Sequence, residues 1–98
     1  MLAKMEFRNF FPNPDLLKAV SQILNQLIVM TPVDTVATAF LEKTKNMYRC
    51  SIDIYSKNEI FIISKLGKNP NMALEKMEKI LWEKIINFNQ QKKFSGEV

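Results

Sequence analysis

The chain has no histidine, one cysteine and two glycines, and each of these low counts excludes a class of protein. Without histidine there is no Cys₂His₂ zinc finger and no histidine-based catalytic triad. A single cysteine, Cys50, cannot build a disulfide framework. Gly67 and Gly96 stand apart, so the sequence has no glycine-rich loop to cradle a phosphate.

Long apolar runs are also missing. The longest is only a few residues, too short to cross a membrane, and no apolar stretch of a secretory signal follows Met1. We therefore expect a cytoplasmic protein without a membrane partner. The composition is that of a globular protein, 47% hydrophobic and 24% charged. With 98 residues, the chain is expected to form a single domain over 1–90, followed by a flexible polar tail over 91–98.

The net charge of +4 is concentrated in one part of the chain. Residues 43–68 hold six cations against Asp53 and Glu59, whereas the bases and acids of the remaining chain balance. Such an excess favours binding to an anionic partner such as a nucleic acid, and it is equally compatible with an ordinary solvated surface. The six cations are Lys43, Lys45, Arg49, Lys57, Lys65 and Lys68.

The first third of the chain predicts a strand and a helix. Residues 3–8 alternate between apolar and charged side chains, which is typical of a half-buried strand. Asn13 is suited to cap a helix, Pro14 to its first position and Asp15 to the positive end of its dipole. Apolar residues at three- and four-residue spacing then predict an amphipathic helix that ends at Thr31-Pro32.

The remaining chain predicts three strands and a second helix. Residues 33–42 are rich in Val, Thr, Ala and Phe, and residues 47–55 alternate regularly, with Cys50 on the apolar face. A short hairpin loop at 56–58 leads to a strand over 59–66 that is apolar on both faces. The last helix is predicted from about Met72 to Phe88.

This order, β-α-β-β-β-α, predicts an α+β fold. The strand-helix-strand start favours a parallel pairing of the first two strands, followed by an antiparallel meander. Two helices with apolar stripes are most simply buried side by side on one face of a four-stranded mixed sheet, which leaves the other face open. If the open face carries the odd-numbered residues of the last two strands, it shows Arg49, Ser51, Asp53, Tyr55, Phe61, Ile63 and Lys65.

Nothing in the sequence indicates catalysis. No carboxylates are paired at a defined spacing, and no acidic cluster offers oxygen ligands to a metal. Cys50 has no histidine to activate it and is expected in the core. We therefore predict that the protein is not an enzyme and has neither a cofactor nor a metal.

The cations are better placed for binding RNA. Three of them surround the turn near residue 45, and Lys65 and Lys68 lie where the last strand meets the last helix. Side chains in such positions contact phosphates without reading bases. Tyr55 and Phe61 are candidates for stacking on a base. The predicted RNA contacts are Lys43, Lys45, Arg49, Lys65, Lys68, Lys76 and Lys79.

A second hypothesis is a protein-interaction module. The open sheet face or the flank of the last helix would then contact a partner, and a homodimer through Phe61 and Ile63 is its simplest form. The candidate interface residues are Tyr55, Phe61, Ile63 and Trp82. Alternatively, Phe94 of the tail covers these rings.

Two segments carry a resemblance to a known family. Residues 50–59 read Cys-Ser-Ile-Asp-Ile-Tyr-Ser-Lys-Asn-Glu, and residues 69–75 read Asn-Pro-Asn-Met-Ala-Leu-Glu. The first is similar to the alternating strand, hairpin and Glu, and the second to the start of the last helix, of the ribosome hibernation promoting factor family, also called ribosome-associated inhibitor A or the sigma-54 modulation protein family. The resemblance covers nearly the whole chain by architecture, and these motifs are patterns of small and apolar residues.

The resemblance implies a non-enzymatic protein that binds the small ribosomal subunit through basic side chains on ribosomal RNA. Such proteins overlap the paths of messenger and transfer RNA and stop translation in resting cells. This chain departs from the family where Lys57-Asn58 replaces a Gly-Gly hairpin and Asn71 an aromatic residue. The family's basic helix positions fall here on Ile23, Gln26, Ile80, Glu83 and Asn87.

Overall fold

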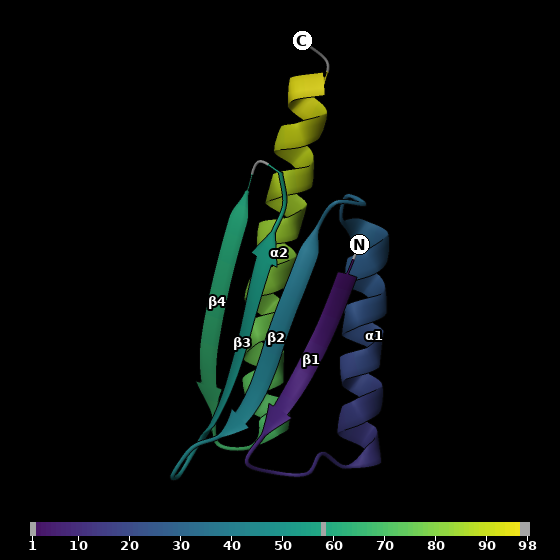
Figure 1. Ribbon diagram of the computed structural model, residues 1–98. Helices are drawn as coiled ribbons and strands as arrows, with labels where there is room; N and C mark the ends of the chain where they lie inside the picture. The colour runs from purple at the N-terminus through teal and green to yellow at the C-terminus, as the bar shows by residue number, and fades with distance from the viewer. Residues whose placement is uncertain (1, 58, 97–98) are drawn as a thin grey trace.

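The computed structural model describes residues 2–57 and 59–96, with side chains described up to Asn89. The elements follow the predicted order β-α-β-β-β-α, which confirms the α+β fold (Figure 1). They are β1 (Leu2–Arg8), α1 (Pro14–Met30), β2 (Val36–Lys43), β3 (Tyr48–Tyr55), β4 (Ile60–Gly67) and α2 (Pro70–Gly96).

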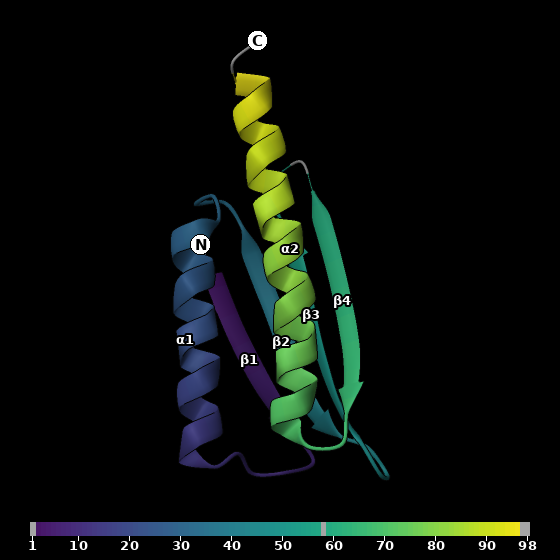
Figure 2. The same ribbon diagram turned by 180° about the vertical axis from the view of Figure 1, so that it is seen from behind.

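The four strands form one sheet in the order β1-β2-β3-β4. β1 runs parallel to β2, and the other two neighbouring pairs are antiparallel, as predicted. α1 and α2 both cover the same face of this sheet, and none of the described helices lies on the opposite face (Figures 1 and 2). All of the core therefore lies between the helices and one face.

The signals at the start of α1 act as predicted. The Asn13 side-chain oxygen accepts a hydrogen bond from the Leu16 backbone N–H at 2.8 Å, and Pro14 is the first helical residue. Leu16, Val20 and Ile23 are buried on the inner stripe. The helix ends at Met30, before Thr31 and Pro32, because the residue before a proline avoids the helical conformation.

The inward face of the sheet carries small and branched residues in its middle strands. Ala37, Ala39 and Leu41 of β2 pair with Ile54, Ile52 and Cys50 of β3, and all six are buried. The Cys50 side chain has no exposed surface, as predicted, and desolvation by burial raises the pKa of its thiol to about 12. The buried apolar residues are Leu16, Val20, Ile23, Leu27, Ala37, Ala39, Leu41, Cys50, Ile52, Ile54, Ile63, Ala73, Leu74, Met77, Leu81 and Ile85.

The predicted open-face pattern is right for β3 and wrong for β4. Tyr55 pairs with Ile60, so the hairpin joins an odd to an even position and the parity reverses between the two strands. Phe61, Ile63 and Lys65 therefore lie on the helix-facing side of the sheet. Ile63 is only 3% exposed there, and Phe61 packs edge-on against Phe88 at 5.9 Å between ring centroids.

α2 is longer than predicted at both ends. It begins at Pro70, where the Asn69 side chain accepts from the Met72 backbone N–H at 2.8 Å, and it continues to Gly96 instead of ending near Phe88. The backbone of residues 91–96 is thus helical, and flexibility of the segment 91–98 stays a prediction. The expectation about the Phe94 side chain lies outside the described residues. No helix within the described ranges is long and apolar enough to cross a membrane.

Candidate nucleic-acid interface

Five of the six cations in the basic stretch gather at one end of the sheet. This is the end where β1, β2 and β4 finish and where both helices begin (Figure 1). Lys76 joins them, because its ammonium group donates a hydrogen bond to the Leu66 carbonyl at 3.2 Å. We call this set the cationic end. Its members are Lys43, Lys45, Arg49, Lys65, Lys68 and Lys76.

The turn between β2 and β3 presents Lys45 to solvent. The Thr44 backbone N–H and its hydroxyl both donate to the Met47 carbonyl, at 2.8 and 2.9 Å. These two hydrogen bonds close the turn around its two central residues, which are exposed. Lys43 precedes the turn on β2, where it pairs with Tyr48 across the ladder. The closed turn thus holds Lys45 in solvent just beyond Lys43 at the end of β2.

The junction between β4 and α2 presents a second group of cations. Lys65 lies on the edge strand β4, where it pairs with Cys50 of β3 and remains exposed. Lys68 lies in the short connection to α2. The bond from Lys76 to Leu66 fixes the second turn of α2 against the end of β4. Lys79 lies three residues further along α2 and is also exposed, so it lies beside the cationic end but is not one of its members.

Lys57 is the exception among the six. It lies in the hairpin between β3 and β4, at the opposite end of the sheet (Figure 1). Lys57 is therefore not part of the cationic end, because β3 spans the full height of the sheet before the chain turns.

Arg8 also reaches the cationic end, but its charge is partly neutralised. Its guanidinium group donates two hydrogen bonds to one carboxylate oxygen of Glu6, at 2.8 and 3.0 Å, and lies 4.2 Å from the centre of the Phe40 ring. Arg49 likewise has Glu42 as its direct neighbour across the ladder. Both arginines thus lie on the open face beside acids, whereas the lysines project from turns and edges.

Phe11 is a candidate that the sequence reasoning missed. Its side chain is 99% exposed in the loop between β1 and α1. The loop itself is anchored on both sides of Phe11. Phe10 packs edge-on between Phe7 and Tyr48, and Asn13 caps α1. The loop thus holds a free aromatic ring in solvent at the end of the sheet where the cations gather.

The two helices add to the positive potential of this end. Both α1 and α2 point their first turns towards it (Figures 1 and 2), and unpaired backbone N–H groups give such a helix terminus a partial positive charge. Asp15 offsets this effect in α1, but the first turn of α2 contains no acidic residue. The N-terminus of α2 therefore adds its partial positive charge to Lys65, Lys68 and Lys76 without an acidic residue in its first turn.

The proposed protein-interface residues do not form one surface. Tyr55 is on the open face, as predicted, and is 43% exposed. Phe61 and Ile63 face the helices, which contradicts their assignment to the open face. Trp82 is half-buried on α2, packs against the core and donates its indole N–H to the Glu78 carboxylate at 3.0 Å. Ile63 is buried and Phe61 is half-buried against α2, so these two residues do not provide the open surface that the predicted homodimer needs.

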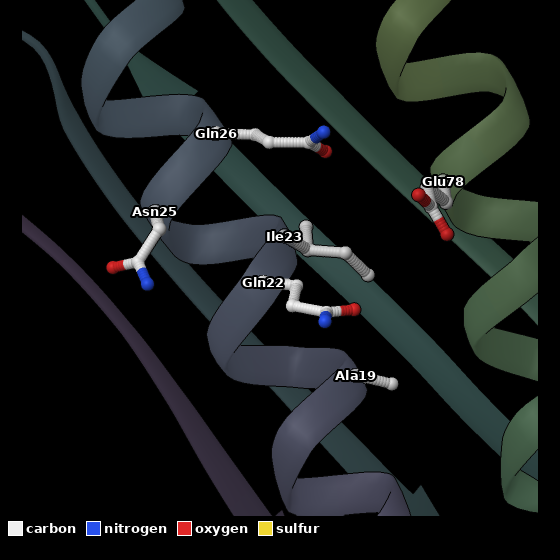
Figure 3. A pocket seen from close by; sticks show the side chains of 6 residues that line it. All are labelled: Ala19, Gln22, Ile23, Asn25, Gln26 and Glu78. Atoms are coloured by element: carbon white, nitrogen blue, oxygen red, sulfur yellow. The ribbon is translucent and has the colours of Figure 1, made fainter.

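A shallow pocket lies between α1 and α2 (Figure 3). Gln22 and Gln26 extend from α1 towards α2, where the Glu78 carboxylate faces them, whereas Asn25 points away. The lining contains a carboxylate and amides but no cation, so it does not suit a phosphate. Within the described residues, no three potential ligands among Cys, Asp and Glu come together to hold a metal ion.

The backbone is similar to that of two solved structures. One is the N-terminal domain of Protein Y from Thermus thermophilus, with a TM-score of 0.72, 13% identity, and coverage of 90% of this chain and 99% of that one. The other is a ribosomal subunit interface protein from Coxiella burnetii, with a TM-score of 0.72, 9% identity, and coverage of 92% and 99%. These likenesses establish the fold. No protein-family model and no curated protein matches the sequence.

Proposed function

We propose that this domain binds the small ribosomal subunit through ribosomal RNA and blocks the path of messenger and transfer RNA in resting cells. The mechanism is obstruction by shape and charge, without catalysis. The observation that carries this proposal is the cationic end, where six basic side chains and two helix N-termini come together. The likeness in fold between this chain and a ribosomal subunit interface protein supports the choice of the ribosome as the RNA partner.

The cationic side chains suit phosphates better than bases. Lysines on turns and strand ends carry mobile point charges, which attract the backbone of any folded RNA without reading its sequence. The elements that bear these lysines are anchored in the fold, because β2 and β4 belong to the sheet and α2 buries Met77 and Leu81 in the core. The scaffold thus holds the charges at one end of the sheet, and Lys79 lies beside them on α2.

Phe11 supplies a contact of a different kind. An exposed aromatic ring next to cations stacks on an unpaired base, and such stacking tolerates any base identity. Together, stacking and phosphate contacts favour a single-stranded or irregular part of ribosomal RNA over a regular duplex. This role replaces the one that the sequence suggested for Phe61, whose ring is occupied by Phe88.

Co-sedimentation with purified small subunits at low salt tests the proposal. Lys45→Glu and Lys57→Glu are a matched pair, because each reverses one exposed lysine in a hairpin but at opposite ends of the sheet. We expect Lys45→Glu to weaken binding by on the order of tenfold and Lys57→Glu to have little effect. A wild-type protein that stays at the top of the gradient, or equal losses in both variants, would contradict the proposal.

Blocking of the RNA path needs a separate measurement. Increasing amounts of the protein should displace labelled messenger RNA and transfer RNA from small subunits and inhibit a reconstituted translation reaction. Lys45→Glu should inhibit only at higher concentration. Binding without displacement would leave the ribosome as the partner and reject the obstruction mechanism.

A further inference from the structure

The open face of the sheet changes character from one end to the other. The register places its side chains in four rows that cross all four strands. The row farthest from the cationic end is entirely apolar, and the row nearest to it contains three charged residues. In the order β1 to β4, the rows are Leu2-Val36-Tyr55-Ile60, Lys4-Thr38-Asp53-Ile62, Glu6-Phe40-Ser51-Ser64 and Arg8-Glu42-Arg49-Leu66.

The apolar end of this face is a patch that none of the described residues covers. Ile60 and Ile62 are 61% and 65% exposed, and Leu2, Val36 and Tyr55 are also exposed. They are neighbours in adjoining rows, so they form one continuous surface. Contiguous apolar surface that is rimmed by polar residues marks an interaction site. Lys4, Thr38 and Asp53 provide that rim on the neighbouring row.

Two such faces can be stacked so that one pair of opposite charges meets and no like charges meet. Consider a two-fold axis that runs parallel to the strands and passes between β2 and β3. Each row then faces the same row of the second copy, with β1 opposite β4 and β2 opposite β3. Leu2 then meets Ile60 of the second copy, and Val36 meets its Tyr55. In the charged row, Glu42 meets Arg49 of the second copy, and the symmetric contact repeats this pair. No two like charges face each other in any row.

The size of the face sets the strength of such a contact. Four strands about 4.8 Å apart and about 25 Å long give roughly 480 Å² for each copy. Two copies together bury about 1,000 Å², which is at the lower limit for specific protein interfaces. The twist of each sheet lets two such faces stack in aligned packing.

We infer that two copies of this chain associate face to face through the open sides of their sheets. The apolar row supplies the burial, and the reciprocal Glu42–Arg49 pairs fix the register. Because the interface is small, the dimer is weak and forms with rising concentration. This inference does not depend on the proposed ribosomal function. It also replaces the predicted homodimer through Phe61 and Ile63 with one through the residues that the register exposes.

Sedimentation equilibrium over a range of concentrations tests the inference. We expect a monomer–dimer equilibrium in the wild type and a dissociation constant about tenfold higher or more in Ile62→Lys. The control is Ile28→Lys. Ile28 is an exposed isoleucine on α1, on the other side of the sheet, so this variant should dimerise as the wild type does. A protein that is monomeric throughout, or an Ile62→Lys variant that dimerises normally, would overturn the inference.

A charge exchange tests the register. Glu42→Arg and Arg49→Glu should each weaken self-association, because each variant places like charges opposite one another. A mixture of the two variants should form heterodimers, in which every Arg faces a Glu. Heterodimers no tighter than either homodimer would contradict the proposed symmetry, and so would a dimer that neither substitution weakens.

Discussion

Gly67 allows the chain to turn from β4 directly into α2. A Cβ atom at this position would lie 2.9 Å from the Ala73 Cα and from the Met72 carbonyl carbon, and closer still to the Ala73 nitrogen. All three are backbone atoms, so no side-chain rotation relieves the clash. Ala73 itself has no exposed surface. The glycine therefore sets how closely the first turn of α2 approaches the sheet.

Replacement of Gly67 by alanine should destabilise the fold. The strand and the helix would have to separate, and overpacking of this kind costs about 1–3 kcal/mol. Urea denaturation of Gly67→Ala measures the loss. Ser64→Ala is the control, because Ser64 is an exposed residue of the same strand. Equal stability of the two variants would show that α2 can shift without cost.

Cys50 should make stability depend on alkaline pH. Burial raises the pKa of its thiol from 9.0 to about 12, so between these values the unfolded chain loses this proton and the folded chain keeps it. The unfolding free energy should then fall by about 1.4 kcal/mol per pH unit above pH 9 from this group. Denaturation under reducing conditions at pH 8 and 10 measures it. Cys50→Ala should show a smaller decrease, and the same decrease would exclude the thiol as its source.

At the scale of the element, both helices begin with the same device. Asn13 and Asn69 each precede a proline and accept a hydrogen bond from a backbone N–H three residues later, at 2.8 Å in both cases. The two helices therefore start at fixed residues, and both starts lie at the cationic end. This repeated Asn-Pro motif determines where each helix begins, and so where the positive end of its dipole lies.

Loss of a cap should lower stability without changing the fold. Asn13→Ala should cost about 1 kcal/mol, because the Leu16 N–H loses its partner. Asn13→Asp should retain most of this stability, since a carboxylate oxygen can accept the same hydrogen bond. Thermal unfolding followed by circular dichroism compares the three proteins. If the alanine and aspartate variants were equally stable, the cap would not be responsible.

An element is predictable from the sequence where its residue pattern fits only one kind of secondary structure and only one buried face. β1, α1 and β3 follow from regular alternation or from a cap and an apolar stripe. The faces of β4 do not, because both parities are apolar and the loop before Ile60 decides which one faces the helices. The end of α2 does not follow either. The mostly polar residues after Phe88 indicate that the helix stops there, but no proline or glycine ends it before Gly96.

The candidate site was predictable to the same extent. A meander brings the end of β4 beside the β2–β3 turn, so the grouping of Lys45 with Lys68 follows from topology alone. The same topology places Lys57 at the other end. The Phe10-Phe11 pair gives no sign of which ring packs inside, because that choice depends on contacts with Phe7 and Tyr48.

At the scale of the whole molecule, the charges at one end make RNA binding sensitive to salt. Each phosphate contact releases counterions, and the slope of log affinity against log salt changes by about 0.7–0.9 per contact. Combined replacement of Lys43, Lys45 and Lys68 by Gln should therefore reduce the slope by about 2 to 3. Fluorescence anisotropy of labelled protein with small subunits at several KCl concentrations measures this. Parallel lines for the two proteins would show that these lysines do not touch phosphates.

The parallel pairing of β1 with β2 has a consequence for how the chain is made. During synthesis, β1 and α1 emerge before residues 36–43, so β1 has no neighbour to pair with until β2 is complete. The three later strands are joined by short turns and can zip together locally, whereas closing the loop around α1 has a larger entropic cost. β1 should accordingly be the last strand to gain protection from hydrogen exchange in a refolding experiment, although it is the first to be translated.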